Sequence, residues 1–146
     1  MIPDFDESGN LPPGIHDATW DEVVERYGGN RRRERLLQGL KRALDDLRAA
    51  GCQTVYLDGS FVTQKELPGD FDACWVPDGV SSDDLHPSLL KLTIPRSAQK
   101  RRYGGELVIA DGLSEPFGPR YLQFFQQDAR TGQVKGIIKV DLKELP

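Results

Sequence analysis

The chain has 146 residues, of which 38% are hydrophobic and 29% charged, so it predicts one globular domain over residues 1–146 with a single core. A formal net charge of -4 argues against a protein that coats nucleic acid, because such binding depends on a large positive field. No apolar run approaches the roughly 20 residues that span a bilayer, and the acidic start is unlike a signal peptide. We therefore expect a cytoplasmic protein that does not bind membranes.

The first third of the chain predicts two helices. Residues 1–17 are rich in Pro, Gly and Asp and predict irregular structure. Thr19 begins a capping-box pattern, which predicts a short helix that ends at the glycine pair 28–29. Asn30 is a suitable N-cap for a second helix, whose apolar stripe of helical period continues to the terminating Gly51.

The remainder of the chain predicts short strands with intervening turns and helices. In chain order these are strands at 53–58 and 71–76 joined by the loop 61–69, a short helix within 81–92, a strand at 106–110, a helix or strand at 121–126, a turn at 129–132 and a last strand at 136–142. This order favours a small α+β fold, in which helices pack on one face of a small mixed β-sheet.

Two clusters of basic residues interrupt the acidic composition. One comprises Arg31, Arg32, Arg33 and Arg35 at the start of the second helix, and the other comprises Arg96, Lys100, Arg101 and Arg102 ahead of a predicted strand. Charge runs are usually solvated faces. The functional alternative is a path for phosphate or RNA toward a metal site.

A pair of aspartates at the start of the second predicted strand has the pattern of a metal site. Side chains alternate along a strand, so Asp70 and Asp72 would project from one face with converging oxygens. Two converging carboxylates repel unless a cation such as Mg²⁺ lies between them, and the alternative is a solvated strand entry. Ten residues before Asp70, the first strand ends in Gly59 and Ser60. A glycine without Cβ lets a phosphate approach the backbone amides.

An apolar strand ending in Gly-Ser, followed by Asp-hydrophobic-Asp, resembles the signature of the DNA polymerase beta-like nucleotidyltransferase superfamily. The resemblance covers residues 57–73, and it implies that Gly59 and Ser60 bind nucleotide phosphates while Asp70 and Asp72 bind two catalytic Mg²⁺ ions. Residues 11–15 and 135–138 also resemble those of a family of short prokaryotic nucleotidyltransferase-like proteins, for which the resemblance implies no particular substrate.

The loop after Gly-Ser offers two further candidates for nucleotide binding, Thr63 and Lys65. A lysine here would reach the phosphates of the nucleotide as a point charge, and the alternative is an exposed loop lysine. The sequence departs from many small nucleotidyltransferases at this point, because residues 61–63 replace the arginine that often follows Gly-Ser.

The resemblance also implies a third carboxylate on a neighbouring strand, which helps to deprotonate the attacking hydroxyl. Glu106 begins the predicted strand after the helix that follows Asp72, whereas Asp141 has apolar neighbours but lies one element later. We favour Glu106. For either residue, the alternative is a strand-end carboxylate in water or paired with a base.

Two functional hypotheses follow. The first is a metal-dependent nucleotidyltransferase that moves a nucleoside monophosphate from a nucleoside triphosphate to a hydroxyl group of RNA, protein or a small molecule. One metal would activate the acceptor hydroxyl and the other would stabilise the leaving pyrophosphate. The second is a catalytically inactive nucleotidyltransferase-like binding module, as part of a toxin-antitoxin or defence pair. A domain this short leaves little surface for an acceptor, so a homodimer or a protein partner is expected to complete the site.

Overall fold

A five-stranded mixed β-sheet organises the chain. In the computed structural model, which describes residues 1–92 and 95–146, the strands are β1 (Gly14–Ala18), β2 (Thr54–Asp58), β3 (Phe71–Trp75), β4 (Gly105–Ile109) and β5 (Gly136–Asp141). Their spatial order is β1-β5-β2-β3-β4, with β1 parallel to β5 and β3 parallel to β4, while β2 is antiparallel to both of its neighbours. The predicted α+β class with a small mixed sheet is confirmed.

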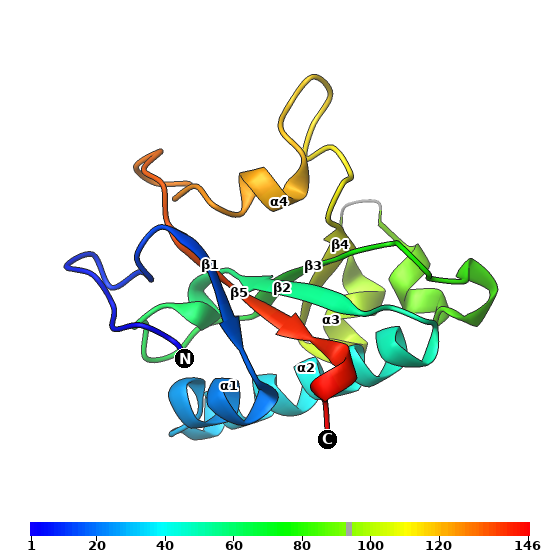
Figure 1. Ribbon diagram of the computed structural model, residues 1–146, viewed down its shortest axis with the longest axis horizontal. Helices are drawn as coiled ribbons and strands as arrows, with labels where there is room; N and C mark the ends of the chain where they lie inside the picture. Colours follow the sequence, from blue (N-terminus) through cyan, green and yellow to red (C-terminus); the bar gives the residue numbers. More distant parts are fainter. Residues whose placement is uncertain (93–94) are drawn as a thin grey trace.

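Helices cover both faces of this sheet unequally. Figure 1 shows α1 (Trp20–Tyr27), α2 (Arg31–Ala49) and α3 (Ser97–Tyr103) on one side, and the short α4 (Tyr121–Phe124) on the other. The prediction that helices pack on one face therefore holds for α1 to α3 and is wrong for α4. None of the helices formed by the described residues is both long and apolar enough to cross a membrane.

Both predicted helix starts are confirmed at the level of the caps. The Thr19 hydroxyl accepts a hydrogen bond from the Glu22 amide at 3.2 Å, and the Glu22 carboxylate accepts from the Thr19 amide at 3.0 Å. Asn30 Oδ1 accepts from the Arg33 amide at 2.9 Å. Gly51 follows α2 with a φ of 101°, a conformation that favours glycine and ends the helix.

Two local predictions were wrong and one helix was not predicted, each where tertiary contacts decide the structure. Residues within 1–17 form β1, because this strand gains its hydrogen bonds only by pairing with the distant β5. The helix α3 was missed, since its basic sequence buries only Gln99 and Tyr103 and has no apolar stripe. The helix predicted within 81–92 is replaced by two 3-10 turns, Ser82–Asp84 and Pro87–Leu90.

The sheet separates a large core from a small one. The large core lies between the sheet and α1 to α3, and Leu57, Ala73 and Leu107 point into it. The small core lies on the opposite face and comprises Cys74, Val108, Ala110, Phe125 and Ile137. Because side chains alternate along a strand, Asp58, Asp72 and Glu106 lie on the face of the small core.

Candidate functional site

Three carboxylates from adjacent strands form a row across the sheet. Asp58 at the end of β2 is the register partner of Asp72 in β3, and Asp72 is the register partner of Glu106 in β4. We call Asp58, Asp72 and Glu106 the carboxylate row. Directly paired residues on one face of a sheet have neighbouring side chains, so the row concentrates negative charge at one edge of the small core.

Asp70 joins the row from the loop side. It lies immediately before β3 rather than within it, which corrects the prediction that Asp70 and Asp72 share a strand. Asp70 is half-buried, and its Oδ2 lies 3.9 Å from the Lys100 ammonium. Its charge nevertheless acts on Asp72, as the electrostatics of the row show.

Glu106, and not Asp141, is the carboxylate beside Asp72. Asp141 ends β5 and pairs with Thr54 at the opposite end of β2 from Asp58. Its Oδ1 accepts a hydrogen bond from the Lys143 amide at 2.9 Å, as the N-cap of a terminal 3-10 turn. Of the two candidates from the sequence, only Glu106 is placed to act together with Asp72, and its catalytic role stays a prediction.

Burial and mutual repulsion disfavour the charged form of the central carboxylate. Burial first, and then the charges of Asp70, Asp58 and Glu106 in that order of size, raise the pKa of Asp72 to about 7, while the charge of Lys135 opposes the rise. Burial also raises the pKa of Asp58, although Lys135 opposes this effect. The same cause raises the pKa of Asp70. Such crowding of carboxylates typically requires a compensating cation or a functional reason.

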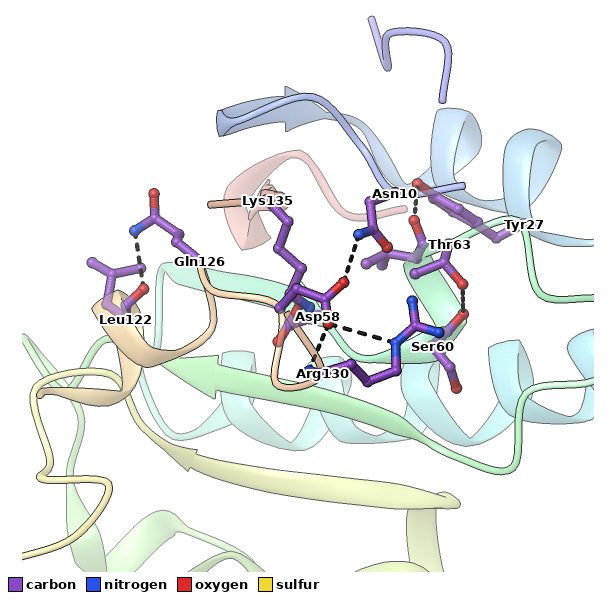
Figure 2. Close-up of polar contacts among 11 residues, drawn as sticks. Asn10, Tyr27, Asp58, Ser60, Thr63, Leu122, Gln126, Arg130 and Lys135 are labelled. Atoms are coloured by element: carbon purple, nitrogen blue, oxygen red, sulfur yellow. Dashed lines mark hydrogen bonds and ion pairs between the residues drawn. The ribbon is translucent and has the colours of Figure 1, made fainter. Parts of the chain in front are cut away.

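Three basic side chains partly compensate this charge. The Lys135 ammonium pairs with the buried Asp58 carboxylate (Figure 2). At the other end of the row, Glu106 lies 3.5 Å from the Lys100 ammonium and 3.6 Å from the Arg96 guanidinium. Arg96 is buried and donates a further hydrogen bond to the Tyr121 hydroxyl at 3.1 Å. Arg96 and Lys100, from the second basic cluster, therefore face the row.

The Gly-Ser turn packs directly against the centre of the row. Gly59 has a φ of 84°, and a Cβ added there would lie 2.6 Å from Oδ2 of Asp72. Only glycine satisfies both the conformation and the space. Ser60 begins a 3-10 turn, Ser60–Val62, and its carbonyl accepts a hydrogen bond from the Thr63 hydroxyl at 2.7 Å (Figure 2).

Thr63 and Lys65 have different surroundings. The Thr63 hydroxyl also accepts a hydrogen bond from the Lys65 amide at 3.2 Å, so it stabilises the loop itself. The Lys65 side chain is exposed, and its charge is a small effect opposing the burial that raises the pKa of Asp70. The role of both residues in nucleotide binding stays a prediction.

Arg33 stabilises the loop that follows the Gly-Ser turn. The side chain is 6% exposed, and its guanidinium donates hydrogen bonds to the carbonyls of Tyr27, Phe61, Thr63 and Lys65. It therefore belongs neither to a solvated face nor to a phosphate path, the two alternatives that the sequence offered for its cluster.

Sequence reasoning missed three residues of the site. Arg33 precedes the leucines of the apolar stripe by helical spacing, which indicates a buried position. Asp58 alternates with Val55 and Leu57 of the large core, so strand periodicity alone places it on the opposite face of the sheet. Lys135 left no such signal, because its contact with Asp58 joins residues 77 positions apart.

The donors of the row are oxygens, but they do not surround a common point. Within residues 1–92 and 95–146, no group of three or more His, Cys, Asp or Glu side chains is placed to hold a metal ion. The reason is visible in the contacts, since Asp58 turns to Lys135 and Glu106 turns to Lys100 and Arg96. Mg²⁺ often takes only one or two protein carboxylates, with waters and substrate phosphates as its other ligands. The hard oxygen donors of Asp70 and Asp72 fit that mode.

The chain was compared with known protein families. The model of a family of unknown function, DUF6932, matches residues 3–141. The chain belongs to this family. The match includes the carboxylate row, the Gly-Ser turn and Lys135, so the site lies within the part of the chain that defines the family. No curated protein and no solved structure matches the chain.

Proposed function

We propose that the chain is a metal-dependent nucleotidyltransferase that moves a nucleoside monophosphate from a nucleoside triphosphate to a hydroxyl acceptor on RNA, protein or a small molecule. The observation that carries this proposal is the carboxylate row, with the raised pKa of Asp72 at its centre and the Gly59 backbone against its carboxylate. A nucleotidyltransferase-like fold is part of the proposal.

Asp70 and Asp72 are the residues that would hold Mg²⁺. Crowded carboxylates gain from a cation that removes their repulsion, and oxygen ligands suit Mg²⁺. Two ions are expected. When bound, Mg²⁺ supplies positive charge to the phosphates and lowers the pKa of a bound hydroxyl.

The remaining residues of the site would position the reactants. The turn at Gly59 and Ser60 exposes backbone to a phosphate where no side chain interferes. Lys100, which lies 3.9 Å from Asp70, and the exposed Lys65 would offset the charge of a triphosphate. Glu106, the neighbour of Asp72, would accept the proton of the attacking hydroxyl.

A binding module that has lost turnover is the second candidate, and a specific observation favours it. Lys135 pairs with Asp58, while Arg96 and Lys100 pair with Glu106, so the side chains of the protein already neutralise both ends of the row. Such a module would serve as one half of a toxin-antitoxin or defence pair. For the enzyme, a second copy of the chain or a protein partner would supply part of the acceptor surface.

Titration calorimetry with Mg²⁺ and each nucleoside triphosphate tests the nucleotide site. We expect Mg²⁺-dependent binding that is lost when Asp70→Asn and Asp72→Asn are combined. Asp83→Asn combined with Asp84→Asn is the matched control, because both carboxylates are exposed and the charge change is equal. If the intact protein binds no triphosphate in the presence of Mg²⁺, the enzyme proposal is wrong, and a nucleotidyltransferase-like module whose function lies in a protein partner remains.

Turnover separates the enzyme from the module. Transfer is followed with triphosphates labelled at the α-phosphate, in the presence of RNA, protein or small-molecule acceptors, together with release of pyrophosphate. We expect Glu106→Gln to bind the triphosphate like the intact protein but to lose transfer. Triphosphate binding without any transfer or pyrophosphate release would instead support the binding module.

A further inference from the structure

A hollow lined by arginines lies on the face of α3 that points away from the carboxylate row. It has a volume of about 400 Å³ and is lined by Arg42, His86, Ser88, Ala98, Arg101 and Arg102. We call it the arginine hollow. The hollow is shallow and open to solvent.

The spacing of residues along α3 explains how this short helix contributes to both the carboxylate row and the arginine hollow. Arg96 and Lys100 are four residues apart, and both pair with Glu106 of the row. Residues 98, 101 and 102 have the spacing of a single helix face and line the hollow. The basic cluster of α3 is therefore divided, with one half facing the row and the other half facing the hollow.

The arginines of the hollow differ in how far they are neutralised. The Arg102 guanidinium donates two hydrogen bonds to Asp46 Oδ2, at 3.0 and 3.1 Å, and is therefore paired. Arg42 donates to the Arg102 carbonyl at 2.7 Å. Among the carboxylates of the described residues, none lies within ion-pair distance of Arg42 or Arg101. Two guanidinium charges at the hollow thus remain available for an anion.

His86 adds an oriented donor to these charges. Its Nδ1 accepts a hydrogen bond from the Ser88 amide at 3.1 Å, so the proton of the neutral ring resides on Nε2. The hollow is then lined by the guanidinium groups of Arg42 and Arg101 and by the His86 imidazole, while Asp46 pairs with Arg102. Guanidinium groups match the geometry of phosphate oxygens.

We propose that the arginine hollow binds the phosphate group of a phosphate ester. Phosphate binding at the hollow is independent of the proposed nucleotidyl transfer. The phosphate belongs either to the backbone of single-stranded RNA or to a small phosphorylated molecule, because both present the same charged group.

The test measures binding to the intact protein without Mg²⁺ or triphosphate, in a chelator, so that it does not depend on the metal site. The probes are a fluorescent single-stranded RNA of about 12 nucleotides, a length that covers typical site sizes, and inorganic phosphate or ribose 5-phosphate. The variant combines Arg42→Gln with Arg101→Gln. Its matched control combines Arg31→Gln with Arg35→Gln, two exposed arginines of α2 that do not line the hollow.

We expect RNA affinity to fall about tenfold or more in the variant, with a decrease of about two in the slope of log affinity against log salt, and little change in the control. Binding of ribose 5-phosphate alone, lost in the variant, would support the hollow with a small molecule as the source. No binding of any probe, or equal weakening in variant and control, would overturn the proposal. Asp70→Asn combined with Asp72→Asn should leave phosphate binding at the hollow intact. Failure of the arginine hollow is therefore distinguishable from failure of the nucleotide site.

Discussion

Asp72 is the central residue of the carboxylate row. It lies between Asp58 and Glu106 in the sheet register, and Gly59 packs against its carboxylate. In proteins, a carboxylate that is both buried and surrounded by like charges destabilises the fold when ionised. Such a cost is characteristic of functional sites, where stability is sacrificed for activity.

This cost makes the stability of the metal-free protein depend on pH. The folded-state pKa of Asp72 is raised to about 7, above its unfolded value. The contribution of the neutral Asp72 carboxyl to stability is therefore complete below about pH 4 and is lost as the pH rises through 7. Asp72→Asn removes the ionisation. We expect it to stabilise the protein by on the order of 2 kcal/mol near pH 8 and to have little effect near pH 4.

Thermal unfolding in a chelator at both pH values measures this difference, with the exposed Asp83→Asn as the control. Equal melting temperatures of the Asp72→Asn protein and the intact protein near pH 8 would contradict the assigned crowding of carboxylates.

Gly59 is the second residue of the site that the structure requires, because a side chain does not fit at its position. Gly59→Ala introduces a Cβ 2.6 Å from Asp72 Oδ2 at a backbone φ of 84°, so we expect a loss of on the order of 2–3 kcal/mol and of triphosphate binding. Gly132→Ala is the matched control, because its φ is 73° and nothing lies within 4 Å of the added atom. Denaturant unfolding should show a loss of only about 1 kcal/mol for that control. Equal losses would mean that Gly59 is needed for its conformation alone.

At the scale of elements, the loop after β2 owes its shape to α2. Arg33 joins the two by donating to carbonyls of the loop, and its guanidinium lies over the rings of Tyr27 and Phe61. The loop contains Ser60, Thr63 and Lys65, so the position of these side chains depends on a helix that is distant from them in the sequence.

Replacing Arg33 therefore should affect both stability and the loop. We expect Arg33→Met to lower the free energy of unfolding by about 2–4 kcal/mol, because several buried carbonyls lose their donor, and to weaken triphosphate binding. Arg31→Met, on the exposed face of the same helix, should change neither quantity appreciably. Urea unfolding and calorimetry are the measurements. A stable Arg33→Met protein with unchanged binding would show that the loop holds its shape without this contact.

At the scale of the whole molecule, the two cores differ in how well they are protected. The large core collects residues from α1 to α3 and the sheet, whereas the small core depends on Phe125 and its neighbours in the segment 111–135. Each core contains one buried cysteine, with Cys52 in the large core and Cys74 in the small one. Segments with few buried contacts open at a lower free energy than the whole domain.

The two thiols allow this difference to be measured. We expect Cys74 in a Cys52→Ala protein to react with a thiol reagent at least about tenfold faster than Cys52 in a Cys74→Ala protein, through local opening of the segment 111–135. Labelling rates are compared with the rate of global unfolding of each variant. If both thiols react only at the global rate, the two cores open as one unit.

The sequence alone determined the features that depend on near neighbours along the chain. Helix caps at Thr19 and Asn30, the apolar stripe of α2 and the alternation in β2 and β3 are local patterns, and all were recognised. The order of elements, together with the topology that the resemblance implies, favoured Glu106 over Asp141, and only Glu106 is paired with Asp72 in the sheet.

Only the tertiary structure decided the features that depend on pairing between distant segments. Sheet register placed Asp58 beside Asp72, packing of the segment 111–135 brought Lys135 to Asp58, and the two faces of α3 divided one basic cluster between two places. The physical reason is that strand pairing and ion pairs arise between residues many positions apart, and no local periodicity encodes which partners meet.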